Sequence, residues 1–291
     1  MVLRFGAVGG WIELAKRVGA ALARSSPPIL VSVIESGSPG NIRGIESGQI
    51  DLGVGASPFP ELAYLGRGEF SKPTTHVRLI AGIIGIPEPM FIVVARGGAI
   101  RSIGDLRGKR VWAGNPGWAT TRLSKVLLGA AGVADQKRIE NSTYKEACDK
   151  FLAGMLDALF VGTDLKSPNP RLEKLRDEVG IRILGYDTDI RAEAMKKLPG
   201  LIEVTIPKGF LGVLEEPVAT VAFVHRIVVR DDLPEEVIYR VTKALWENID
   251  ALGRDLPEFS QSDPRKAAAK TLVPLHPGAA RYYREMGALK D

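Results

Sequence analysis

The chain has 291 residues, enough for one large or two medium-sized domains, and 45% of them are hydrophobic and 25% charged, as in ordinary globular proteins. Its 39 basic and 34 acidic residues are interspersed and leave a net charge of +5, so the charge pattern does not indicate nucleic-acid binding. The single cysteine, Cys148, excludes a disulfide framework and a cysteine-based metal site.

In the first part of the chain, short β-branched runs alternate with longer segments of helical periodicity. Strands are predicted at 2–8, 29–36 and 50–56, and helices at 11–25 and 39–48. Two further strands, 77–84 and 90–96, are expected on either side of a Pro-Glu-Pro turn at 87–89. Such alternation is typical of a parallel or mixed sheet with helices on both faces. No internal repeat is apparent.

A second strand–helix series begins near residue 102. A strand at 110–113 leads through a glycine-rich loop into a helix, and Cys148 shares a helical face with apolar residues, which indicates a core thiol. The remaining predicted elements are strands at 157–163, 181–187 and 217–230, followed by helices at 233–254 and 264–272. No run of 18 apolar residues is present, so a transmembrane helix is not expected.

We therefore predict an α/β fold of two lobes. Residues 1–90 and 226–291 form lobe one, and residues 91–225 form lobe two. The chain crosses between them twice, through the strands at 90–96 and 219–229. Two lobes joined by two strands are expected to leave a cleft that closes on a ligand by hinge bending.

Three glycine-rich loops join a strand to a helix, at 5–11, 35–44 and 114–121. The first turn of a helix has unpaired N–H groups and the positive end of the helix dipole, so an anion fits there. Glycines allow a ligand to approach the backbone, and nearby hydroxyls can donate to it. The candidate ligand-binding residues are Gly9, Gly10, Trp11, Ser36, Ser38, Asn41, Ser57, Gly117, Trp118, Thr120, Thr121, Thr163 and Asp164.

Some of these candidates fit two roles. Trp11 and Trp118 suit an aromatic wall of a ligand site, and equally a plug at the junction of helix and sheet. Asp164 disfavours an anion and suits an ammonium or hydroxyl group. No phosphate-loop, G-x-G-x-x-G, H-E-x-x-H or G-x-S-x-G pattern occurs, so we expect no nucleotide cofactor, no catalytic metal and no serine hydrolase chemistry.

Several short motifs follow one another in an order that is similar to that of a known family. They comprise Gly6 to Gly10, Gly37 to Arg43, Ser47 to Leu52, Asp105 to Val111, the set Gly114, Pro116, Gly117 and Thr120, then Ile206 to Gly209, and Pro274 to Ala279 followed by Arg281 to Glu285. Over nearly its whole length the chain resembles the solute-binding subunits of TRAP transporters, the TAXI family in particular.

The resemblance implies a type II periplasmic-binding-protein fold, a small carboxylate ligand and delivery to the membrane subunits of a TRAP transporter, without catalysis or cofactor. It also implies a periplasmic location, with an export signal removed because none follows Met1; a cytoplasmic location is the alternative. Two departures, Ala7 for serine and Trp118-Ala119 for Ser-Gly, favour a more apolar or aromatic acid. Two alternatives stay open, an enzyme on the same fold, for which Asp164 and Glu13 are the available acids, and a sensor that presents its ligand to a signalling partner.

Overall fold

The computed structural model describes residues 1–114, 119–133, 139–140 and 142–290. The chain forms two compact units, unit 1 from residues 1–86 and 224–291 and unit 2 from residues 87–223. It passes from unit 1 to unit 2 within strand β4 (Val77–Ala95) and returns within β10 (Val218–Arg230). The sequence places these boundaries after residues 90 and 225.

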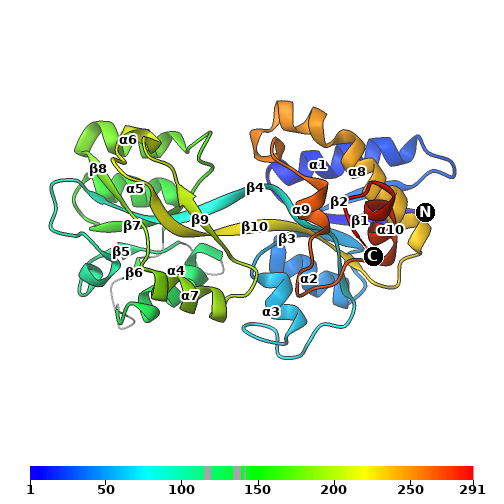
Figure 1. Ribbon diagram of the computed structural model, residues 1–291, viewed down its shortest axis with the longest axis horizontal. Helices are drawn as coiled ribbons and strands as arrows, with labels where there is room; N and C mark the ends of the chain where they lie inside the picture. The colour runs from blue at the N-terminus through cyan, green and yellow to red at the C-terminus, as the bar shows by residue number, and fades with distance from the viewer. Residues whose placement is uncertain (115–118, 134–138, 141, 291) are drawn as a thin grey trace. The chain divides into compact units, whose positions relative to one another are not determined.

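Unit 1 contains three parallel strands and one antiparallel strand in the order β2-β1-β3-β10. The parallel strands are β1 (Val2–Ala7), β2 (Leu30–Glu35) and β3 (Leu52–Ala56). The helices are α1 (Gly10–Ala23), α2 (Ser38–Glu46), α3 (Phe59–Tyr64), α8 (Glu235–Asp255), α9 (Pro264–Ala268) and α10 (Pro277–Glu285). Helices α1 and α8 lie together on one side of the strands, and α2 and α3 lie on the other (Figure 1). The strands and helices predicted before residue 57 are confirmed.

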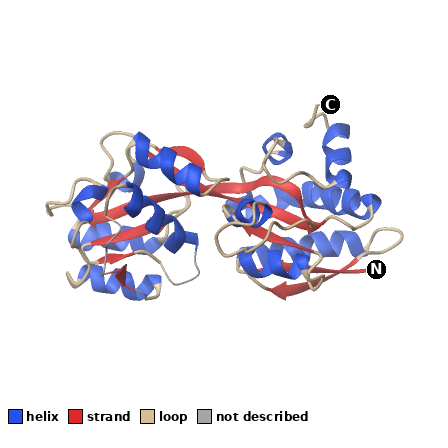
Figure 2. Ribbon diagram, turned by 90° about the horizontal axis from the view of Figure 1, so that it is seen from below, coloured by secondary structure: helices blue, strands red, loops and turns tan. Residues whose placement is uncertain are grey.

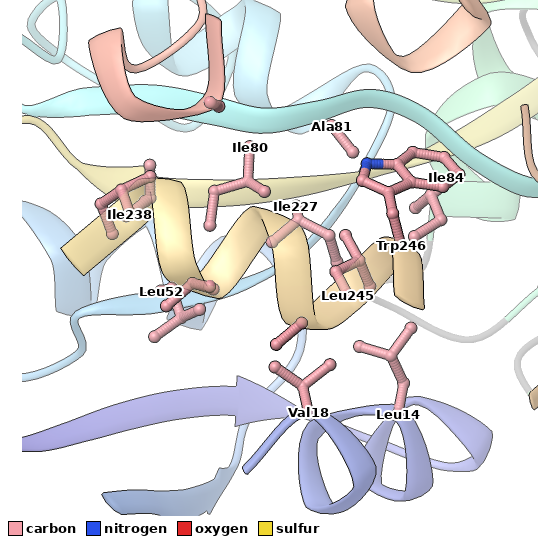
Figure 3. Packing of buried hydrophobic residues seen from close by; sticks show 14 of the residues in the cluster. Leu14, Val18, Leu52, Ile80, Ala81, Ile84, Ile227, Ile238, Leu245 and Trp246 are labelled. Carbon is pink, nitrogen blue, oxygen red and sulfur yellow. The ribbon is translucent and has the colours of Figure 1, made fainter. Parts of the chain in front are cut away.

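The core of unit 1 lies between the strands and the pair α1 and α8. Leu14 and Val18 of α1 point toward Leu245 of α8, and Ile80 and Ile227 of β4 and β10 lie in the same cluster (Figure 3). Leu14, Val18 and Leu22 recur every four residues, so one face of α1 is buried. Each such side chain contributes roughly 1.5–3 kcal/mol on full burial, which fixes the helix against the sheet.

Unit 2 has the same strand order. Strands β5 (Val111–Trp112), β6 (Ile139–Glu140) and β7 (Ala158–Gly162) are parallel in the order β6-β5-β7, and β4 lies antiparallel to β7. Two more strands complete it, since β8 (Ile181–Leu184) pairs with β4 and β9 (Ile202–Ile206) with β10. The helices are α4 (Ala119–Ala130), α5 (Tyr144–Leu152), α6 (Pro170–Val179) and α7 (Thr188–Lys197). Figure 2 shows helices flanking the strands within each unit.

One expectation for β4 is wrong. The sequence predicts two strands separated by a turn at 87–89, but β4 is one strand of 19 residues that continues through Pro87 and Pro89. Proline fixes φ near −65°, which an extended chain accepts, and its missing N–H matters only where a ladder partner is needed. Strand β4 pairs with β7 from Met90 onward and with β8 from Ile92 onward, beyond both prolines. The core position of Cys148 is confirmed, because its side chain is buried in the apolar cluster of unit 2.

An arginine–aspartate clamp recurs in the two units, although no repeat is apparent in the sequence. In unit 1, Asp51 precedes β3 and accepts hydrogen bonds from the Arg4 backbone N–H (2.8 Å), Nε (2.9 Å) and Nη2 (2.9 Å). In unit 2, Asp157 precedes β7 and accepts the same three bonds from Arg110 at 2.7, 3.1 and 2.8 Å. Each clamp ties the first of the three parallel strands of its unit to the third.

Replacing Asp51 with Asn is expected to lower the free energy of unfolding by about 2–3 kcal/mol, because hydrogen bonds to charged groups are worth about 1.5–3 kcal/mol. Asp157→Asn is the matched control and is expected to lose less, because the Asp157 side chain is 27% exposed and that of Asp51 only 5%. Urea unfolding at neutral pH measures both losses. An equal or larger loss in Asp157→Asn contradicts this account of the clamps.

The stability difference between the natural protein and Asp51→Asn is expected to depend on pH. Burial alone would raise the pKa of Asp51, but hydrogen bonds from Arg4 and the charges of Arg4 and Arg230 hold that pKa below its usual range. A carboxylate with a depressed folded-state pKa stabilises the fold above its unfolded pKa, and this contribution is lost as the pH falls through the folded-state pKa. The stability difference between the natural protein and Asp51→Asn should therefore shrink below a pH of about 4.

Candidate functional site

The loops that the sequence singles out in unit 1 meet at the carboxyl edge of its parallel strands. The Ser36 N–H donates to the Ala7 carbonyl at 3.2 Å, and the Ala56 N–H donates to Ser38 Oγ at 2.9 Å. The first bond joins the ends of β1 and β2, and the second joins the end of β3 to the start of α2. Ligands of open α/β sheets are bound at this edge, so the predicted position of the loops agrees with the geometry.

Two of the unit 1 candidates hold the backbone together. Asn41 is fully buried, and its NH2 group donates to the carbonyls of Gly6 (3.0 Å) and Val54 (2.9 Å). Ser57 is also fully buried, and its Oγ accepts the Val224 N–H at 3.0 Å. Both amide hydrogens of Asn41 are engaged, and the Ser57 hydroxyl is buried away from the surface, so both side chains act on the shape of the edge.

Trp11 packs as a plug between helix and sheet. Its ring centroid lies 4.7 Å from those of both His225 and Phe259, and burial lowers the pKa of His225 to about 4, so this imidazole is neutral at neutral pH. At the start of α1 the acidic side chain of Glu258 lies beside Gly10, since a Cβ built on Gly10 would be 2.3 Å from Glu258 Oε1. Gly9 is exposed, with a φ of 57° that glycine accommodates.

In unit 2, the carboxyl ends of β5 and β7 open into a cavity of about 280 Å³. Its described lining consists of Glu88, Trp112, Thr120, Tyr144, Phe160, Val161, Gly162 and Asn169. The cavity is therefore close to the lower end of the range for small-molecule sites, about 300–1,000 Å³. Aromatic walls with a few polar groups are the usual composition of such sites.

The polar side chains of this cavity come from three elements. Thr120 is in the first turn of α4, and Asn169 precedes α6, where its Oδ1 accepts the Arg171 N–H at 3.0 Å. This bond orients the Asn169 amide, whose NH2 group has no hydrogen bond within the described part of the chain. Glu88 comes from β4, and burial raises the pKa of its carboxyl group.

The remaining unit 2 candidates do not appear among the described residues that line the cavity. Thr163 is buried and its Oγ1 accepts the Asn169 N–H at 3.0 Å, so it supports the loop that presents Asn169. Asp164 Oδ1 accepts the Lys166 N–H at 2.8 Å. Thr121 is buried beside Gly114. Gly117 and Trp118 lie outside the described residues.

Sequence reasoning missed most of the cavity. Glu88 was visible as a carboxylate inside an apolar run, but the flanking prolines favour a turn there. Trp112 and Phe160 resemble ordinary strand residues, and Tyr144 an ordinary helix residue, until the fold brings them together. Of the lining residues, only Thr120 is among the candidates that the sequence predicts.

Two larger cavities in unit 2 fit a ligand less well. One of about 350 Å³ is lined by Leu156 and Asp157, which precede β7, and so lies at the amino edge of the strands. Another, of about 340 Å³, lies along β8 and β10, and its lining includes none of the candidate residues predicted from the sequence. In the described residues no group of three or more His, Cys, Asp or Glu side chains could hold a metal ion. None of the described helices is long and apolar enough to cross a membrane.

In unit 1 the loops that follow the parallel strands gather at one edge of the sheet, and in unit 2 a cavity opens at the carboxyl edge of the strands. The periplasmic aliphatic sulphonate binding protein SsuA from Escherichia coli is similar in structure, with a TM-score of 0.52 and 20% identity over 98% of this chain and 82% of that one. An ancestral arginine-binding protein bound to arginine has a TM-score of 0.51 and 19% identity over 87% of this chain and 97% of that one. The predicted type II periplasmic-binding-protein fold is confirmed. The chain belongs to the NMT1-like family, whose model matches residues 6–287.

Proposed function

We propose that the protein is a solute-binding protein, which captures a small organic solute, leaves it chemically unchanged and delivers it to a membrane transporter. The observation that carries this proposal is the unit 2 cavity, in which Glu88, Thr120 and Asn169 meet aromatic walls at the carboxyl edge of the strands. The similarity of the chain's fold to those of solved binding proteins supports the same function.

The solute is a small organic acid in this proposal. A carboxylate would accept hydrogen bonds from the Thr120 hydroxyl, the Asn169 NH2 group and the first-turn N–H groups of α4. The rings of Trp112, Tyr144 and Phe160 favour an apolar or aromatic body, as does the replacement of the family's serine by Trp118. The closure of two lobes over the ligand stays a prediction.

The transporter in this proposal is of the TRAP type and the protein is periplasmic. The support is the ordered set of motifs shared with the TAXI family, which runs from Gly6 to Glu285. A carrier of this kind has no catalytic step, so we also propose that the protein is not an enzyme.

A thermal-shift screen of aliphatic, aromatic, keto and amino acids tests the function. A bound solute at about 100 times its Kd adds about 2.7 kcal/mol of stability, which corresponds to several degrees in Tm for a chain of this size. We expect a few chemically related acids to produce such shifts. A flat response to every acid, or conversion of any of them during incubation, contradicts the proposal.

A further inference from the structure

Glu88 is the one acidic side chain among the described residues that line the unit 2 cavity. Its carboxyl group lies against the end of β7, since a Cβ built on Gly162 would be 2.5 Å from Glu88 Oε1 and 3.0 Å from Glu88 Cδ. In the described part of the chain it forms no hydrogen bond and no ion pair. The absence of a side chain at Gly162 is therefore what makes room for this carboxyl group.

The charge of Glu88 has no partner within the described residues. Burial raises its pKa, because withdrawal from water disfavours the ionised form, and no described arginine or lysine offsets this effect. The ionised form of a carboxyl group withdrawn from water and without a counter-charge is costly in free energy. A bound cation would offset that cost. Groups of this kind, when they line a cavity, are candidates for ligand contacts.

Two aromatic rings line the same cavity as the carboxyl group of Glu88. The ring centroids of Trp112 and Tyr144 are 5.5 Å apart, with 38° between the ring planes. Trp112 Nε1 donates to the Ser142 carbonyl at 2.8 Å, so its N–H is not available to a solute. What the two rings offer a solute is apolar and π surface, and π faces attract cations.

We propose that Glu88 selects solutes that carry a protonated nitrogen, an ammonium or amidinium group, over otherwise identical solutes that lack it. This inference rests on the proposed function. The nitrogen donates charge-assisted hydrogen bonds to Glu88, and the aromatic rings stabilise the same positive charge. The acid group of the solute is left to Thr120 and Asn169, so the two ends of the solute have separate partners.

A metal ion fits this place less well than an organic cation. Calcium takes six to eight oxygen ligands, and magnesium needs a near-octahedral set. Glu88 is the single carboxylate of the described lining, and the described residues provide no metal-binding group of three. The cavity volume of about 280 Å³ limits the cation to a small organic molecule.

Isothermal titration calorimetry on matched pairs tests the inference without any variant. The pairs are phenylalanine and 3-phenylpropanoate, leucine and 4-methylpentanoate, glutamate and glutarate, and glycine and acetate. We expect the amine-bearing member of the pair that fits the cavity to bind about 30-fold or more tightly than its deaminated partner, as for a desolvated charge pair.

Glu88→Gln removes the charge and keeps the size of the side chain. It is expected to reduce the preference within the same pair to about threefold or less. Glu178→Gln on α6 is the matched control, because that glutamate is 50% exposed and lies outside the cavity lining. It should leave the preference unchanged, and circular dichroism confirms that each variant is folded.

The outcomes separate the two proposals. Equal binding of both members of each pair, or an unchanged preference in Glu88→Gln, overturns the role of Glu88 and leaves solute binding intact. If no member of any pair and no acid of the thermal-shift screen binds, the proposed function and this inference fall together.

Discussion

Replacing Glu61 with Gln is expected to lower the free energy of unfolding by about 3–5 kcal/mol, the largest stability effect that we predict for this protein. Glu61 of α3 and Arg226 of β10 form an ion pair at 2.5 Å, with side chains only 1% and 4% exposed. Arg226 also donates to the Gly82 carbonyl. Glutamine leaves the buried guanidinium of Arg226 without a counter-charge, and an unpaired buried charge strongly destabilises the fold.

A double variant separates the cost of breaking the pair from the value of having it. Glu61→Leu combined with Arg226→Met removes both charges, and apolar replacements of buried ion pairs are often neutral or stabilising. We therefore expect the double variant to be more stable than either Glu61→Gln or Arg226→Met. Urea unfolding of all three variants, compared with the natural protein, measures the coupling.

An exposed ion pair of the same unit provides the control. Arg281 Nη2 lies 2.7 Å from Glu236 Oε2, with side chains 36% and 63% exposed. Glu236→Gln should cost less than about 1 kcal/mol, because exposed pairs are screened by water and salt. A loss in Glu61→Gln no larger than that in Glu236→Gln would show that the buried pair is not a structural necessity.

Gly162→Val is expected to weaken solute binding by about 100-fold or more, because it fills the cavity in which we place the solute. The new Cβ would lie 2.5 Å from both Glu88 Oε1 and Met90 Sδ, and would force these flexible side-chain ends into the remaining space. Gly162 has no positive φ, so the backbone of β7 accepts valine without strain. Calorimetry with the solute that emerges from the screen measures the loss.

Gly97→Val is the matched control for this substitution in unit 2. A Cβ at Gly97 has no neighbour within 4 Å, and its φ is not positive. We expect binding by this variant to equal that of the natural protein. Binding by Gly162→Val with an unchanged Kd would place the solute elsewhere in the molecule.

Much of the fold of unit 1 could be predicted from local patterns, because its strands and helices before residue 57 carry their own periodicity. The apolar spacing of Leu14, Val18 and Leu22 defines α1 without knowledge of its partners. The two clamps could not be predicted in this way. Asp51 and Asp157 reach their arginines only when the parallel strands lie in register, and register depends on contacts between distant segments.

The site could be predicted only in part for a related reason. Glycine-rich loops indicate strand-to-helix turns, so the residues at the carboxyl edge of the sheet can be predicted from the sequence. The function of a side chain at that edge cannot be predicted in this way. Asn41 is polar and lies within a glycine-rich loop, but its NH2 group donates to two backbone carbonyls. Glu88 shows the converse, because its place in the cavity depends on a glycine 74 positions further along the chain.

The most direct test of the account is native mass spectrometry of the protein with the acid that gives the largest thermal shift, followed by chemical analysis of the recovered acid. We predict a complex of one solute per chain, released on denaturation with its mass and structure unchanged. Recovery of a chemically altered compound, or a complex that never forms at solute concentrations well above the apparent Kd, would contradict the claim that this protein binds and carries a small solute.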